Sequence, residues 1–497
     1  MKKARQVIVM MTDTQRIDML GCYGNKDMHT PNLDRLAEEG MRFEKAYTCQ
    51  PVCGPARSAI FTGLYPHSNG SWTNSMALAD NVKTIGQRLH DHGIHTAYIG
   101  KWHLDGGDYF GLGRCPEGWD PAYWYDMRCY LEELSEDDRR WSRTPRIMEE
   151  REIKEDFTFA HRCSNRAIDF LSKYHKDDFL LVFFYDEPHH PYVCPEPYAS
   201  MYKDYHFPKS RNIWDDLSNK PEHHRVWAGE SLMEDKDALV INPYYFLGCN
   251  SFVDYEIGRV MDAIDRYTPD ALVIYTSDHG DMLSSHSLNG KGPAMYEEIT
   301  HIPFIVKWPG VIRENTIYSN PVSHIDIAPT ILDVMGIPVP KLLEGNSLAP
   351  VLENPKKQVK DIVFMEFGRY EIDHDGFGGY QPIRAAYNGR YKLVINLMTS
   401  DELYDLEKDP EEMVNLIHSE EHTAIRDELH DRILEWMNDT RDPFRGYYWE
   451  RRPWRTDARQ ATWDYTKMTR QRENEEYEPR QLDYATGLEM TEAVRIK

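Results

Sequence analysis

Two stretches of the chain are almost wholly apolar, and each ends in a polar turn. Residues 5–13 read RQVIVMMTD, and residues 270–281 read DALVIYTSDHGD. Strands that are buried on both faces of a parallel sheet show such continuous runs, because neither face meets water. Residues 95–103 and 177–190 have the same character. The sequence therefore predicts a sheet whose central strands are covered on both sides.

Amphipathic segments separate these runs. Residues 30–40, TPNLDRLAEEG, and residues 83–93, KTIGQRLHDHG, each predict a short helix that closes at a glycine. Strands that alternate with helices are typical of an α/β sandwich. We expect this fold class, with a large mixed β-sheet between helices.

The pattern changes near residue 360. Residues 361–367, 384–397 and 401–416 alternate between apolar and polar side chains, and Asn388-Gly389 is a typical hairpin turn. These features predict a short antiparallel sheet. Residues 423–439 predict one amphipathic helix beside it.

The chain is thus expected to divide into three regions. These are a main α/β domain at 1–360, a smaller C-terminal α/β subdomain at 361–440, and an arm at 441–497 that is rich in Arg, Trp and Tyr. One interpretation is that the arm packs over its own domain or over a neighbouring subunit, which would make a homo-oligomer. The other is a lid that adds arginines to the pocket of this or another protomer.

Charge and composition exclude several classes of function. The formal net charge of −24 argues against a nucleic-acid partner, because phosphates would be repelled. No stretch approaches the roughly 20 apolar residues of a membrane span. The start, MKKARQVIVMMTDTQR, has too short an apolar run for a signal peptide, so a cytoplasmic protein without a membrane partner is expected. The eight cysteines form no CxxC pair, which disfavours a zinc site or a disulfide framework.

Polar residues with metal-binding potential follow two of the predicted strands. Asp13 ends the first run, and Asp278 and His279 end the second. Ligands of open α/β sheets bind beyond the carboxyl ends of the strands, so these residues can meet there. Two carboxylates and an imidazole suit a divalent cation harder than zinc. The alternative is that the acids cap loops and the histidine is merely solvated.

A cysteine stands at the start of a predicted helix in TCQPVCGPARSAIFTGLYPH, residues 48–67. Pro55 suits a first helical turn, which places Cys53 at the helix N-terminus, where free N–H groups favour a thiolate. Arg57 lies one turn further and can hold an anion or the modified side chain. The alternative is a small buried cysteine before an ordinary helix.

The stretch CGPARSAIFTGLYP resembles the CxPxR maturation motif of the formylglycine-dependent sulfatases, the type I sulfatases of the alkaline phosphatase superfamily. Further segments resemble the family in the same order, over roughly residues 5–440. They are IVMMTDTQRIDMLGCYG, IGKWHL, PHHP, TSDHGDMLSSH, KGPAMYEEITHIPFIVKWPG, SHIDIAPTILDVMGIP and LYDLEKDPEEMVNL. The resemblance implies an alkaline-phosphatase-like sandwich and hydrolysis of a small anionic sulfate ester.

The resemblance also implies roles for individual residues. A maturase would oxidise Cys53 to formylglycine (3-oxoalanine), whose hydrate attacks sulfur through one hydroxyl and expels sulfate through the other. One divalent metal, Ca²⁺ by family, would be bound by Asp13, Cys53, Asp278 and His279, and formylglycine would be oriented by Arg57 and His103. The sulfate oxygens would be bound by Lys101 and Lys291. His189 would be the acid that protonates the leaving oxygen, with His190 as the competing candidate.

Two departures from the family pattern keep alternatives open. Thr14 stands where many sulfatases have a second Asp, and His279 where many have Asn. This makes Mn²⁺ more competitive with Ca²⁺, unless the Thr14 hydroxyl or Gln15 compensates. The same arrangement resembles phosphonate monoester hydrolases and phosphodiesterases of the superfamily.

A binding protein on the same fold is the other alternative, although the residues of the nucleophile and its ligands are all present. Loops at 115–130 and 367–382 carry Trp, Tyr, Asp and Arg, which suit a sulfated saccharide or simply a polar surface.

Overall fold

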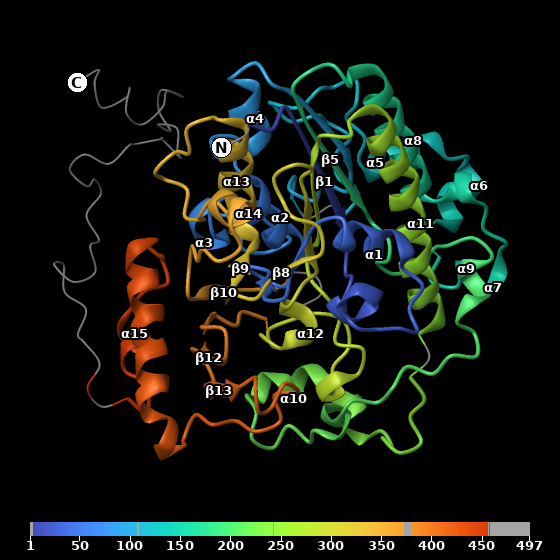
Figure 1. Cartoon of the computed structure of the whole chain (residues 1–497). Coiled ribbons are helices and arrows are strands. Elements are labelled where there is room, and N and C mark those ends of the chain that lie inside the picture. Colours follow the sequence, from blue (N-terminus) through green and yellow to red (C-terminus); the bar gives the residue numbers. More distant parts are fainter. Residues whose placement is uncertain are drawn as a thin grey trace, which may run out of the picture.

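A mixed sheet runs through the centre of the protein (Figure 1). The computed structural model describes residues 3–455 and 457, apart from 107–108, 143, 242 and 372–378. Within these residues the sheet has seven strands in the order β4 (His95–Gly100), β5 (Phe179–Tyr185), β1 (Gln6–Thr12), β6 (Leu272–Ser277), β7 (Phe304–Lys307), β2 (Met41–Phe43) and β8 (Thr316–Tyr318). The strands predicted from the apolar runs are confirmed.

Four adjacent strands, β4, β5, β1 and β6, run parallel, so their carboxyl ends lie at one edge of the sheet. Strand β1 lies between β5 and β6, with Thr12 opposite Tyr185 on one side and Ser277 on the other. Strand β7 is antiparallel to both β6 and β2, which makes the sheet mixed, as expected. Residues that follow β1, β4, β5 and β6 are therefore delivered to the same edge.

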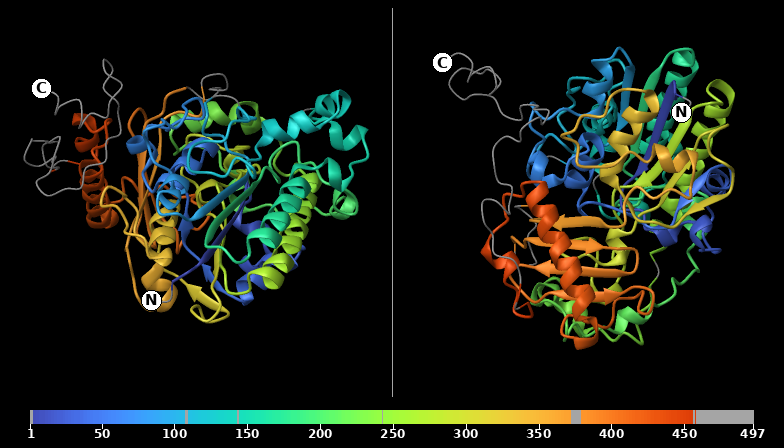
Figure 2. Two further views of the ribbon diagram at one scale, coloured as in Figure 1. Left: turned by 90° about the horizontal axis from the view of Figure 1, so that it is seen from above. Right: turned by 60° about the vertical axis from the view of Figure 1, so that its left-hand side comes forward.

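Helices cover both faces because the side chains of each strand alternate. Val7, Val9 and Met11 pack towards α2 (Cys53–Thr62), α4 (Ile85–His90) and α13 (Ile327–Met335). Ile8 and Met10 pack towards α1 (Pro31–Glu38), α8 (Phe159–Tyr174) and α11 (Tyr244–Tyr267). Figure 2 shows the two helical layers on either side of the sheet.

A second sheet follows in the C-terminal part. Strands β10 (Val363–Phe367), β11 (Ile383–Tyr387), β12 (Tyr391–Asn396) and β13 (Glu402–Asp405) form an antiparallel meander. Helix α15 (Thr423–Asp439) lies across it (Figure 2). This sheet and helix are confirmed, including the turn at Asn388-Gly389, where Gly389 has a φ of +94° that suits glycine. The exact domain boundaries at 360 and 440 stay a prediction.

Shorter elements connect the main ones. They are β3 (Ala46–Tyr47), β9 (Val322–Ser323), α3 (Pro66–Asn69), α5 (Met127–Glu133), α6 (Glu136–Trp141), α7 (Ile147–Glu150), α9 (Tyr198–Met201), α10 (Glu222–Ala228), α12 (Glu297–Thr300), α14 (Ala349–Glu353) and α16 (Tyr447–Glu450). Short 3-10 turns lie at Ile17–Met19, Gly21–Tyr23, Glu155–Phe157, Arg211–Trp214, Gly229–Met233, Ser285–Ser287, His324–Asp326 and Glu420–His422.

The first part of the predicted arm packs onto the C-terminal sheet. Trp449 of α16 is buried, and Arg384 of β11 donates to both carboxylate oxygens of Asp442 at 2.6 and 3.0 Å. Residue 456 and the arm from 458 onward lie outside the described residues, so its role as a lid or in a homo-oligomer stays a prediction. Among the described residues, no helix has the length and apolarity needed to cross a membrane.

The Arg384–Asp442 pair should contribute strongly to stability because both side chains are buried. Arg384→Ala would leave the Asp442 carboxylate buried without its charge partner, and we expect a loss of about 3–5 kcal/mol in the free energy of unfolding. The control is Arg5→Ala, whose pair with Asp178 is 67% and 46% exposed, and which should cost less than about 1 kcal/mol. Urea unfolding of both variants tests this. Equal losses would contradict it.

Candidate active site

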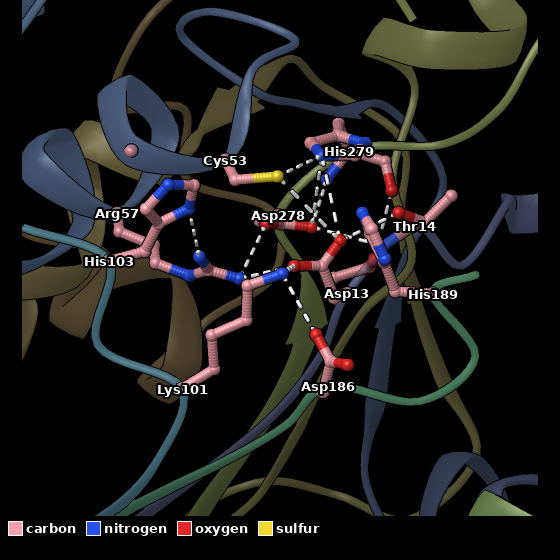
Figure 3. A network of polar contacts seen from close by, with 12 residues as sticks. Asp13, Thr14, Cys53, Arg57, Lys101, His103, Asp186, His189, Asp278 and His279 are labelled. Carbon is pink, nitrogen blue, oxygen red and sulfur yellow. Dashed lines mark hydrogen bonds and ion pairs between the residues drawn. The ribbon is translucent and has the colours of Figure 1, made fainter. Parts of the chain in front are cut away.

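Charged side chains converge at the carboxyl ends of the central strands (Figure 3). Asp13 follows β1, and Asp278 and His279 follow β6. Lys101 and His103 follow β4, and Asp186 and His189 follow β5. Cys53 and Arg57 come from the first turns of α2, and Lys291 comes from the loop after β6. The structure thus brings together every residue that the sequence singled out for the site.

Arg57 joins the two carboxylates at the centre. Its Nη2 donates to Asp13 Oδ2 at 2.5 Å and to Asp278 Oδ2 at 3.0 Å, and the guanidinium lies 4.1 Å from the centroid of the Phe184 ring. Lys101 Nζ donates to the same Asp13 oxygen at 2.7 Å. All four charged side chains of this cluster are fully buried.

The two carboxyls respond differently to the same environment. Burial raises the pKa of Asp278 to about 6, and the negative charge of Asp13 adds to this effect. Burial also opposes ionisation of Asp13, but Lys101, His189 and Arg57 together bring the pKa of that carboxyl well below its usual value. Asp13 is therefore the carboxylate that the cations of the site hold most firmly in its ionised form.

The thiol of Cys53 lies among these charges. Lys291 Nζ lies 2.9 Å from Sγ, and His279 Nε2 lies 3.3 Å from it. Burial and Asp13 act to raise the pKa of this thiol, but Lys291, Lys101 and His279 outweigh them and lower it well below the usual range. The most nucleophilic atom of the cluster thus lies at the N-terminus of α2.

The N-terminus of α2 is capped by Asn74, a residue that the sequence analysis did not single out. Val52, the residue before α2, makes no side-chain cap. Instead, Oδ1 of Asn74 accepts a hydrogen bond from Gly54 N at 2.9 Å, and Asn74 N donates to Tyr370 O at 3.0 Å. The buried Asn74 therefore caps α2 from a neighbouring loop. Nothing in the local sequence marks this role, because the cap and the helix start are twenty residues apart.

His103 faces the same cluster from the other side. Its Nδ1 lies 3.4 Å from Arg57 Nη1, and because a guanidinium only donates, Nδ1 is the acceptor and Nε2 carries the proton. Burial, followed by Lys101 and Arg57, lowers the pKa of His103 well below its usual value. The imidazole is thus neutral, with one N–H to offer.

Of the two competing histidines, His189 is the one beside the cluster. Figure 3 shows its ring turned towards Asp13 and Thr14, whereas the His190 side chain is exposed. His189 Nδ1 lies 2.9 Å from His190 O and 3.1 Å from the hydroxyl of Tyr109. Sequence reasoning did not single out Tyr109 or Asp186, which contact His189 and Lys101 respectively.

The donor set suits a divalent metal. One ligand atom each of Asp13, Cys53, Asp278 and His279 can be chosen so that all four lie within 4.8 Å of one another. His279 Nδ1 lies 2.9 Å from Gly280 O, a carbonyl that only accepts, so Nδ1 carries the proton and the Nε2 lone pair is left for a metal. Two carboxylates and an imidazole are the donors expected for a cation such as Ca²⁺ or Mn²⁺.

Of the two residues that follow Asp13, Thr14 contacts the carboxylates of this donor set and Gln15 does not. Thr14 has a φ of +67°, and its hydroxyl donates to Asp13 Oδ1 at 2.6 Å while its N–H donates to Asp278 Oδ1 at 3.1 Å. The amide of Gln15 instead donates to Asn250 Oδ1 at 2.9 Å. Thr14 is therefore the residue that adjoins the carboxylates, and Gln15 is engaged elsewhere.

A mixed sheet between helical layers, with acids, cations and a thiol buried at its strand ends, defines the sulfatase-type class of the alkaline phosphatase superfamily. Comparison with known families agrees: the Sulfatase family model matches residues 5–337, and the model for the C-terminal part of N-sulphoglucosamine sulphohydrolase matches residues 287–439. The chain belongs to the sulfatase family and is a sulfuric ester hydrolase.

Individual relatives show how far the likeness extends. The uncharacterized sulfatase YidJ of Escherichia coli (strain K12) is 46% identical over 504 residues, which cover 100% of this chain and 99% of that protein. The N-acetylglucosamine-6-O-sulfatase of Bacteroides thetaiotaomicron is 26% identical over 88% of this chain and 87% of its own. The crystal structure of a phosphonate monoester hydrolase of Agrobacterium radiobacter shares the fold, with a TM-score of 0.73, 21% identity, and coverage of 88% and 96%.

The cap on α2 should affect both stability and turnover. Asn74→Ala removes the acceptor for Gly54 N, so we expect a loss of about 1 kcal/mol in the free energy of unfolding. Because this N–H adjoins Cys53, we also expect a lower kcat for an aryl sulfate. The matched control is Thr84→Ala, which removes the cap of α4. It should cost similar stability with unchanged kcat, and a similar kcat for both variants would refute the positioning role of Asn74.

Proposed function

We propose that the protein hydrolyses the sulfate monoester of a saccharide through a formylglycine made from Cys53. The observation that carries this proposal is the position of Cys53, within the CxPxR motif at the N-terminus of α2, with Sγ 2.9 Å from Lys291 Nζ and 3.3 Å from His279 Nε2. A nucleophile here is buried among groups that stabilise negative charge. Membership of the sulfatase family supports the same chemistry.

The nucleophile would arise when a maturase, with an external oxidant, oxidises the Cys53 side-chain carbon to an aldehyde, so that the C–S bond breaks and the sulfur leaves. Water then adds to the aldehyde to give two hydroxyls on one carbon. One hydroxyl oxygen attacks sulfur, the bond from sulfur to the ester oxygen breaks, and the bonding pair leaves with that oxygen. The second hydroxyl then loses its proton, the aldehyde re-forms, and sulfate departs. Arg57 and His103 lie within hydrogen-bond reach of each other and would orient residue 53.

Asp13, Asp278, His279 and residue 53 would hold the metal, with Ca²⁺ favoured by the family and Mn²⁺ by the nitrogen ligand. A divalent cation at this position supplies Lewis acidity to the nucleophile. Asp13 keeps its ionised form through the neighbouring cations, above all Lys101.

The anionic ester would bind to the lysines. Lys101 and Lys291 approach the cluster from two sides, and both are buried. Fixed positive charge in a water-poor site stabilises the charge that develops on the sulfate oxygens in the transition state. The overall charge of −24 does not oppose this, because distant surface charges are screened.

His189 would protonate the leaving oxygen. Its ring lies beside the cluster, and its Nδ1 is engaged by the carbonyl of His190, which leaves Nε2 for the substrate. Burial, then Lys101, lowers the pKa of free His189 to about 4. An anionic ester would counter this effect, because negative charge nearby favours the protonated imidazole.

A saccharide is the alcohol that the relatives favour, since one of them is named as an N-acetylglucosamine-6-O-sulfatase. The Trp and Tyr residues of loop 115–130, which the sequence suggested for a sugar ring, are buried in the core, where Trp119 and Trp124 pack against Trp102, so that expectation is wrong. Loop 367–382 lies partly outside the described residues.

Phosphonate monoester hydrolysis is the second candidate. Thr14 and His279 favour it, and a phosphonate monoester hydrolase shares the fold. Phosphonate monoesters carry one negative charge, as sulfate esters do, so the same lysines can bind both.

A matched substrate pair separates the two reactions. We expect kcat/KM for para-nitrophenyl sulfate to exceed that for para-nitrophenyl phenylphosphonate, on protein whose Cys53 conversion is confirmed by mass spectrometry. Cys53→Ala is the control, and it should lose essentially all turnover because the nucleophile is gone. Preference for the phosphonate would establish the second candidate, and turnover by Cys53→Ala would refute the formylglycine mechanism.

Residue 14 should set the choice of metal. Thr14→Asp adds a carboxylate next to Asp13, so we expect Ca²⁺ affinity to rise relative to Mn²⁺ in calorimetric titrations. Thr14→Asn is the matched control, because Asn also tolerates a positive φ but adds no charge. Equal affinity ratios in both variants would show that the carboxylate of residue 14 does not reach the metal.

A further inference from the structure

We propose that Tyr109 and Asp186 are positioning residues that fix the ring of His189, so that its Nε2 faces the leaving oxygen. This inference rests on the proposed role of His189 as the acid of a sulfatase. It concerns two residues that no motif of the chain indicates. Asp186 directly follows β5, and Tyr109 lies in the loop after β4.

One carboxylate oxygen of Asp186 accepts hydrogen bonds from two donors. Its Oδ1 accepts from Lys101 Nζ at 2.9 Å and from the hydroxyl of Tyr109. Because Lys101 also donates to Asp13 Oδ2, one ammonium group connects the metal-side carboxylate with Asp186. The Asp186 carboxylate is mostly buried, which strengthens both interactions.

The direction of each proton follows from these partners. The Tyr109 hydroxyl gives its hydrogen to the Asp186 carboxylate, so its oxygen is left as an acceptor for His189 Nδ1 at 3.1 Å. The other partner of Nδ1, the carbonyl of His190, is also an acceptor. Two acceptors on one side of the ring require a hydrogen on Nδ1. The proton that His189 gives away must therefore sit on Nε2.

Aromatic packing holds Tyr109 in this place. Its ring centroid lies 5.3 Å from that of His189 in a tilted contact, and 5.6 Å from that of His103 in an edge-on contact. Lys101 Nζ lies 3.9 Å from the centre of the same ring. Rotation of the tyrosine would break a cation–π contact as well as two hydrogen bonds. The imidazole of His189 is fixed in turn, because Nδ1 is held from two directions.

The same contacts also stabilise the protonated, positively charged imidazolium form of His189. Burial and the nearby Lys101 and Lys291 disfavour imidazolium at His189, whereas Asp13 and Asp186 favour it. Tyr109 links the ring directly to Asp186. When Nε2 gives its proton to the leaving oxygen, the S–O bonding pair goes to that oxygen, and His189 is left neutral with Nδ1–H still in place.

Dependence on the leaving group tests this role. The measurement is kcat/KM for a series of phenyl sulfates, from para-nitrophenyl sulfate to unsubstituted phenyl sulfate, and for glucose sulfate. Tyr109→Phe keeps the ring but removes the hydroxyl. We expect it to lose roughly 10- to 100-fold on the poor leaving groups, a part of what a general acid contributes, and less than about 3-fold on para-nitrophenyl sulfate.

Two further variants sharpen the result. Tyr205→Phe removes a comparable Tyr–Asp hydrogen bond, to Asp27 at 3.2 Å, away from the site, and it should leave the whole series unchanged. In a His189→Ala background, Tyr109→Phe should add no further selective loss, because the group it positions is gone.

The outcomes are distinct. Equal losses by Tyr109→Phe on good and poor leaving groups would overturn the positioning role, since they would show a general effect on the site. So would a selective loss that persists in the His189→Ala background. If the matured wild-type enzyme turns over none of the sulfates, the proposed function itself fails, and this inference fails with it.

Discussion

The buried contact of Arg57 with two carboxylates is the interaction on which the site depends. Removing charges from water is costly, and each charge here is tolerated only because an opposite charge lies within hydrogen-bond distance. The sheet makes this possible: parallel pairing of β1 with β6 brings Asp13 and Asp278 to one edge, and α2 supplies the guanidinium. The fold thus assembles a cluster that no single segment could keep out of water.

The arrangement of positive and negative charges in this cluster also determines its chemistry. Lys291 beside Cys53 and Lys101 beside Asp13 place fixed positive charge inside the site of a strongly acidic protein. An anionic ester meets this charge only at short range, because distant charges are screened. Lys291 contacts the Cys53 thiol, and Lys101 contacts the carboxylates of Asp13 and Asp186. A bound sulfate would therefore exchange one set of anionic partners for another without exposing the ammonium groups to water, which keeps the site preorganised.

The sequence predicted those parts of the structure that depend on local pattern. The apolar runs at residues 6–12 and 272–277 indicated central strands, and the polar residues after them were correctly expected to meet. Asn74, Tyr109 and Asp186 could not be predicted in this way. Each acts through a partner that is distant in sequence or lies on another loop, as the bond from Gly54 to Asn74 illustrates. Such contacts depend on how loops pack, and loops carry no periodic signal.

Thr14 shows why a departure from a family pattern need not disturb geometry. A β-branched residue at positive φ is unfavourable, and it persists here because its N–H and hydroxyl are bound by Asp278 and Asp13. The backbone at this position is therefore set by the two carboxylates rather than by the side chain of residue 14. A threonine in place of an acid therefore removes one negative charge beside the proposed metal ligands, while its N–H and hydroxyl bind both carboxylates. If these residues hold the metal as proposed, residue 14 can alter the choice of metal through its charge alone.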